Sequence, residues 1–171
     1  MLPLKGNEIK VSVTTDMDIF ELDCYVSELK EVAVRVLALC DIKSGEATIG
    51  LTDDCTVKGL NKTYRGLDEV TDVLSFSTEY PGKYYGGSDG FENSSDRTFA
   101  IPPGEHRQIG EVLISIEQAR RQAVELEITL REELIKLVAH GFLHLLGYDH
   151  MEVREKCEME NLEKTIMLEF V

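Results

Sequence analysis

The sequence predicts an α+β fold in one domain over residues 1–171, with a mixed four-stranded sheet packed against helices. Four stretches dominated by alternating apolar residues indicate strands, and long stretches with good helix formers indicate helices. The predicted strands lie in the first two thirds of the chain, whereas the last third is helical. An apolar fraction of 43% in 171 residues is ordinary for a globular protein with one core.

The first part of the chain alternates between predicted strands and helices. Residues 8–14 and 46–52 alternate between apolar and polar side chains, which predicts two strands. Residues 21–40 between them are largely apolar and rich in helix formers, which predicts a helix packed on the sheet. Asp53 or Asp54 is placed to cap a short helix that follows the second strand.

The second part contains two more predicted strands, at residues 71–78 and 108–116. A helix is predicted over residues 116–127, and a capping box at Thr129 starts the next helix. A charged helix over residues 151–170 closes the chain. This last helix carries an apolar stripe of Met159, Leu162, Ile166 and Leu168.

Residues 79–107 are rich in Gly, Pro, Ser, Asp and Asn, which predicts a long loop insertion between the third and fourth strands. A loop of this length is either functional or a decorative insertion. It contains His106, which we interpret as a surface residue rather than a metal ligand.

The formal net charge of −14 argues against tight binding of nucleic acid through bulk electrostatics. A nucleic acid partner must therefore be engaged by a local patch. No apolar run is long enough to span a membrane, and the N-terminal residues lack the pattern of a signal peptide. We therefore expect a cytoplasmic protein with no membrane partner.

The cysteines form no CxxC pair, and their spacing suggests neither a disulfide framework nor a zinc ribbon. We expect free thiols that are buried or half-buried, as in a reducing compartment. The four residues are Cys24, Cys40, Cys55 and Cys157.

Three of the four histidines lie in the segment HGFLHLLGYDH, residues 140–150. His140 and His144 are one helical turn apart, so on a helix their imidazoles face the same way. Gly147 can adopt the left-handed conformation that ends a helix, and the turn can bring His150 back toward the other two. Three converging imidazoles form an open metal site with a position left for water, as in metal-dependent hydrolases. A structural metal is the alternative, although structural sites usually have four protein ligands.

The same spacing occurs in the metzincin motif HExxHxxGxxH, but Gly141 stands at the position of the glutamate general base. A bound metal could still acidify water, whereas the proton acceptor for peptide hydrolysis is missing. A phosphodiester needs less help from the protein, because the metal can polarise a phosphate oxygen while an arginine holds the phosphate.

Arg65 is the candidate for such an arginine, in a polar segment that precedes the third strand. Its side chain could contact substrate. It could instead pair with Asp68 or Asp72, and composition alone favours this structural role.

Three segments carry a resemblance to a known family: LNKTYRGLDEVTDVLSF at residues 60–76, IGEVLIS at residues 109–115, and HGFLHLLGYDH at residues 140–150. Together they resemble the YbeY family, the bacterial and organellar endoribonucleases of ribosomal RNA maturation. The histidine string is highly specific, and its coincidence with YRGLDEVTDVLSF argues against a chance match.

The resemblance implies a single-domain α+β metalloprotein in which His140, His144 and His150 bind one zinc ion or similar divalent ion per chain. Arg65 matches an arginine on which the family relies for activity. The implied activity is single-strand-specific cleavage of RNA, in maturation of small-subunit (16S) ribosomal RNA ends and in ribosome quality control. The implied partners are single-stranded RNA and the RNA and proteins of the small ribosomal subunit. Three imidazoles also accept nickel, copper or cobalt.

Two residues depart from the family's usual pattern: Ser77 replaces a proline, and Glu111 replaces an aspartate. The insertion is also longer than is typical. No residue is an obvious general base, although Glu111 and Glu133 are acidic candidates that could also be merely solvated. Asp149 either orients a ligand histidine or is a turn residue.

Two other functions stay open at this stage. One is a peptidase or other metzincin-like hydrolase with an open zinc site, which Gly141 disfavours. The other is a ribosome-assembly factor with a mainly structural metal. The acidic charge fits docking on basic ribosomal proteins more easily than binding of naked RNA.

Overall fold

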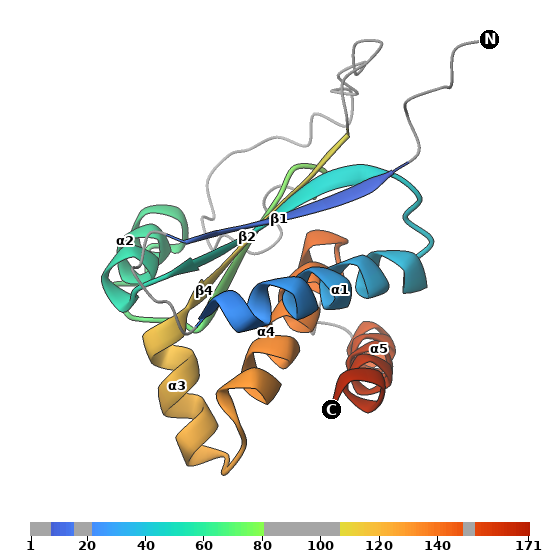
Figure 1. The fold of residues 1–171 in the computed structure, drawn as a ribbon. Coiled ribbons are helices and arrows are strands. Elements are labelled where there is room, and N and C mark those ends of the chain that lie inside the picture. Colours follow the sequence, from blue (N-terminus) through green and yellow to red (C-terminus); the bar gives the residue numbers. More distant parts are fainter. Residues whose placement is uncertain (1–7, 16–21, 81–106, 149–152) are drawn as a thin grey trace, which may run out of the picture.

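The computed structural model describes residues 8–15, 22–80, 107–148 and 153–171. Its elements are β1 (Ile9–Thr15), α1 (Asp23–Leu39), β2 (Gly45–Thr52), α2 (Asp54–Arg65), β3 (Val73–Ser77), β4 (Gln108–Ser115), α3 (Ile116–Glu125), α4 (Leu130–Leu145) and α5 (Val153–Phe170). Figure 1 shows α1, α4 and α5 gathered below the twisted sheet, with α2 at one end of the strands.

The sheet has the strand order β1-β2-β4-β3. β1, β2 and β4 run parallel to one another, and the edge strand β3 runs antiparallel to β4. The mixed four-stranded sheet and its packed helices confirm the predicted α+β class.

The apolar positions of the strands face the helices. Ala47, Ile49 and Leu51 of β2 are buried, as their alternation predicts. Val112 and Ile114 of the neighbouring β4 belong to the same core cluster. Because successive strand residues point to opposite faces, the residues between these positions lie on the other face of the sheet.

The predicted helix starts are found, and one open choice is decided. Asp53, rather than Asp54, caps α2, because its side chain accepts a hydrogen bond of 2.7 Å from the backbone N–H of Thr56. That hydrogen bond lowers the pKa of the Asp53 carboxyl. The capping box of Thr129 with Glu132 is also present at the start of α4.

Helix α4 is the central helix of the fold. It is apolar on most of its sides because it packs against the sheet, α1, α3 and α5 (Figure 1). Its buried apolar residues are Leu134, Ile135, Leu137, Val138, Ala139, Phe142, Leu143 and Leu145. The segment that carries the histidines is therefore held from several directions.

Two expectations about burial were wrong. Leu168 does not belong to the apolar stripe of α5, because its side chain is exposed, and Phe170 packs against the core instead. Three of the four cysteines are exposed, and only Cys40 is half-buried, although all four are free. Among the described residues, no helix is long and apolar enough to cross a membrane.

We predict opposite outcomes for two alanine substitutions on α5. Ile166→Ala should lower the free energy of unfolding by about 2–5 kcal/mol, because Ile166 is 1% exposed in the core. Leu168→Ala should change it by less than about 0.5 kcal/mol, because Leu168 is 77% exposed. Urea unfolding followed by circular dichroism measures both, and equal effects would contradict this assignment of the buried face.

Candidate metal centre

Two serines of β3 hold the C-terminal half of α4 against the sheet. The Ser75 hydroxyl donates a hydrogen bond of 3.0 Å to the carbonyl oxygen of Gly141, and the Ser77 hydroxyl donates one of 2.7 Å to that of Leu145. Two residues along a strand and four along a helix both span about 6–7 Å, so the two contacts are in register. The two bonded carbonyls belong to the residues that follow His140 and His144. The hydrogen bonds therefore set the position of both histidines along β3.

Gly141 is required by the close approach of α4 to β4. A Cβ atom at this position would lie 2.5 Å from Cγ1 of Val112 and 3.3 Å from the Ser75 hydroxyl. A contact of 2.5 Å forces a neighbour to move. The position that holds a glutamate base in metzincins therefore faces the sheet in this protein and has no room for a side chain.

The imidazoles of His140 and His144 face each other, with 3.0 Å between their Nε2 atoms. Each Nδ1 atom has another partner. Nδ1 of His144 lies 2.9 Å from the backbone oxygen of Tyr148, and Nδ1 of His140 lies 2.7 Å from Oε1 of Glu163. A carbonyl oxygen only accepts hydrogen bonds, so Nδ1 of His144 carries the proton and Nε2 of the neutral ring presents a lone pair.

This donor set fits a divalent metal ion. Two nitrogen ligands at about 2.05 Å from a tetrahedral zinc ion lie about 3.3 Å apart, close to the observed separation. Within the described part of the chain, no third His, Cys, Asp or Glu completes a group of three that could hold a metal ion. The predicted ligand His150, the neighbouring Asp149, and His106 lie outside the described residues. The structure therefore brings together two of the three predicted ligands.

Gly147 ends the helix as expected, with a left-handed φ of +87°. The N–H of Tyr148 donates to the carbonyl of Leu143, and the N–H of Gly147 donates to that of His144, which is the Schellman arrangement. Burial raises the pKa of the Tyr148 phenol, and the neighbouring Cys40 raises it further. The turn directs the Tyr148 carbonyl toward His144.

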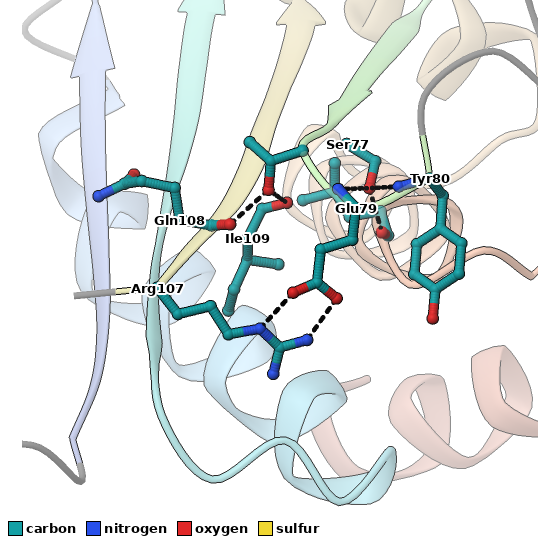
Figure 2. Close-up of polar contacts among 8 residues, drawn as sticks. Ser77, Glu79, Tyr80, Arg107, Gln108 and Ile109 are labelled. Atoms are coloured by element: carbon teal, nitrogen blue, oxygen red, sulfur yellow. Dashed lines mark hydrogen bonds and ion pairs between the residues drawn. The ribbon is translucent and has the colours of Figure 1, made fainter. Parts of the chain in front are cut away.

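Glu79 and Arg107, at the two ends of the insertion, meet as Figure 2 shows, and the ring of Tyr80 lies against Gly147 of this turn. Arg107 forms an ion pair with Glu79, which raises the pKa of the guanidinium through hydrogen bonds. The Thr78 hydroxyl donates to the carbonyl of Ile109 at 3.1 Å. Ser77, at the position of the usual proline, accepts hydrogen bonds from the backbone N–H groups of Glu79 and Tyr80 while donating to α4. A proline could make none of these side-chain contacts.

Arg65 is the last residue of α2, which ends at Gly66 with φ +72°. Neither expected structural partner binds it. Asp68 pairs with Lys62 and Lys58, and Asp72 accepts a hydrogen bond from Gln122. Within the described residues, no hydrogen bond or ion pair of Arg65 is found, so the expected pairing with Asp68 or Asp72 is not seen in this part of the chain.

Tyr64, the neighbour of Arg65 in α2, contacts the face of β3 that is opposite to α4. Tyr64, next to Arg65, packs edge-on against Phe76, with 5.1 Å between ring centroids. Ser75 and Ser77 flank Phe76 in β3 and contact α4. Because side chains alternate along a strand, Phe76 and the Tyr64 ring that packs on it lie on the face of β3 away from α4.

Neither acidic candidate for a general base lies beside the imidazoles. Glu111 follows the same face of β4 as Leu113, near Gly50, whereas Val112 faces α4. Glu133 is buried, and its carboxylate lies 3.4 Å from Nζ of Lys136. It precedes His140 by seven residues, which is about 10 Å along the helix. The expectation that Glu133 could be merely solvated was wrong.

Sequence reasoning missed Glu163 on α5. One signal could have found it, since Glu163 lies four residues after Met159 and three before Ile166, on the buried face of the helix. A carboxylate on an apolar face needs a partner.

Comparison with known proteins identifies the relatives of this chain. The family model described as Endoribonuclease YbeY matches residues 9–171. The chain belongs to the YbeY family. Endoribonuclease YbeY of Moorella thermoacetica is 40% identical to it over 145 residues, 82% of this chain and 85% of the relative. The Bacillus cereus protein of the same name is 35% identical over 149 residues, 86% of this chain and 88% of that one.

A solved structure also shares the fold of this chain. The solution structure of a Thermotoga maritima protein aligns with a TM-score of 0.57 and covers 95% of this chain and 89% of its own. At 23% identity, this likeness supports the α+β fold alone.

We predict that an alanine at Gly141 destabilises this protein by about 1–3 kcal/mol, because the added methyl group overlaps Val112. Gly59→Ala on α2 is the matched control, since nothing lies within 4 Å of a Cβ at Gly59. The control should be neutral or up to about 1 kcal/mol more stable. Chemical denaturation of both variants measures the difference, and an equally stable Gly141→Ala protein would contradict the close packing of α4.

Proposed function

We propose that this YbeY-family protein is a metal-dependent, single-strand-specific endoribonuclease of the cytoplasm. It matures the ends of small-subunit (16S) ribosomal RNA and acts in ribosome quality control, on RNA and proteins of the small subunit. The observation that carries the metal requirement is the opposed pair of Nε2 atoms in His140 and His144. Family membership supports RNA as the substrate, because the relatives are named endoribonucleases.

His140, His144 and His150 would hold one zinc ion or a similar divalent ion. When bound, the ion would polarise a phosphate oxygen and lower the pKa of a coordinated water. The serines of β3 bond to the backbone carbonyls that follow both histidines, which supports a helix already in place when a metal binds.

Helix α2 provides the basic patch that an acidic protein needs for RNA. Lys58, Lys62 and Arg65 are spaced by four and three residues, so they share one face of the helix. Arg65 binds a phosphate of the substrate in this proposal, because its guanidinium can form paired hydrogen bonds with phosphate oxygens. The exposed ring of Tyr64 lies beside it and offers a surface on which an unpaired base can stack.

The replacement of the metzincin glutamate by Gly141 favours a phosphodiester over a peptide substrate. Gly141 leaves no room for the glutamate of a metzincin protease. RNA carries a 2′-hydroxyl that can act as an internal nucleophile, and a phosphodiester already bears the negative charge that a metal and an arginine neutralise.

We predict that His144→Ala lowers bound zinc from about one ion per chain to a small fraction and abolishes cleavage of single-stranded RNA. Elemental analysis and a gel assay on single-stranded and duplex RNA measure the two effects. Circular dichroism checks that the variant stays folded. A folded wild type with zinc but no cleavage would overturn the nuclease proposal in favour of an assembly factor, and loss of fold in His144→Ala would point to a structural metal.

We predict that Arg65→Ala reduces RNA cleavage by about 10²–10³-fold while zinc content stays at the wild-type level. The reason is that the substituted protein loses the positive charge that contacts the phosphate but keeps all metal ligands. Lys43→Ala is the control, because Lys43 is 76% exposed and pairs only with the exposed Asp41 among the described residues. Equal activity of both variants and the wild type would remove Arg65 from the mechanism.

A further inference from the structure

The carboxylate of Glu163 reaches His140 from a separate helix. Oε1 of Glu163 lies 2.7 Å from Nδ1 of His140, which joins α5 to α4 beside the candidate metal position. We infer that Glu163 is a positioning residue, which holds His140 with the proton on Nδ1 and directs Nε2 of the same ring toward the metal. This inference rests on the proposed function and adds Glu163 to the residues of the metal centre.

The surroundings of Glu163 favour a role directed at the histidine. Other acidic residues of α5 pair with surface cations: Glu158 with Arg154, Glu160 with Lys156, and Glu169 with Arg35. Within the described residues, Glu163 forms its ion pair and hydrogen bond with His140 and with no lysine or arginine. Its side chain is 24% exposed, so the contact is partly shielded from water and is stronger than a surface pair.

The imidazoles of His140 and His144 each have a hydrogen-bond acceptor at Nδ1, but the two acceptors differ. The Tyr148 carbonyl holds Nδ1 of His144, and the Glu163 carboxylate holds Nδ1 of His140. Both contacts leave Nε2 as the metal-facing atom. A charged acceptor also makes the opposite ring nitrogen a more basic ligand, and loss of such a partner typically weakens metal binding 10–100-fold.

The docking of α5 places Glu163 in reach of His140. Met159 and Ile166, on the same face of the helix, are buried in the core. The C-terminal end is held by the ion pair between Arg35 and Glu169, and by Arg131, which donates to the carbonyl of Phe170. Helix α5 therefore contributes to the metal centre without supplying a ligand.

The test is zinc affinity of the full-length protein, measured by competition with a chromophoric chelator. We predict that Glu163→Ala weakens zinc binding 10–100-fold and that Glu163→Gln, which keeps an acceptor oxygen without the charge, weakens it less. Glu160→Ala is the matched control, because Glu160 lies on the same helix and pairs with Lys156 at 3.8 Å. This control should bind zinc within twofold of the wild type.

A second readout uses the metal-free protein and does not depend on the proposed function. Nitrogen-15 NMR of the imidazoles should show a proton on Nδ1 of His140 in the wild type, opposite the Glu163 carboxylate, and a reduced occupancy of that proton in Glu163→Ala. Wild-type protein that binds no zinc would refute the metal-dependent function, while the Nδ1 proton would still report on Glu163. Unchanged zinc affinity in both Glu163 variants, with a wild type that binds zinc, would overturn the positioning role alone.

Discussion

The contact between α4 and the sheet is the constraint on which the candidate site depends. Gly141 lets the helix approach Val112 so closely that no side chain fits between them. At that distance, the hydroxyls of Ser75 and Ser77 reach backbone carbonyls of the helix. These carbonyls follow directly after His140 and His144, so the packing that completes the core also sets the position of the imidazoles.

This constraint also bears on the chemistry. A helix packed so tightly cannot present a glutamate next to its first histidine, which separates this site from those of metzincin proteases in spite of the shared spacing. Functional groups must instead come from elements that surround α4. Tyr148 belongs to the turn that ends the helix, and Glu163 to the helix that packs on it.

The positive charge of this acidic protein is locally concentrated on α2. The protein carries a net charge of −14, yet α2 displays Lys58, Lys62 and Arg65 on one face. Asp68, just after the helix, forms ion pairs with both lysines. It therefore neutralises part of the positive charge on this face. The arginine is left without such a partner among the described residues, although two aspartates lie close to it in sequence.

The sequence by itself determined the secondary structure, the capping box of α4 and the left-handed Gly147, because helix periodicity, strand alternation and turn chemistry are local properties. It also placed His140 and His144 on one face of one helix. Only the tertiary structure decided which distant groups meet them. The contact of Glu163 with His140 spans 23 residues, and those of Ser75 and Ser77 with α4 span 66 and 68. Such contacts, like the exposure of Leu168, depend on how helices dock, which local patterns do not encode.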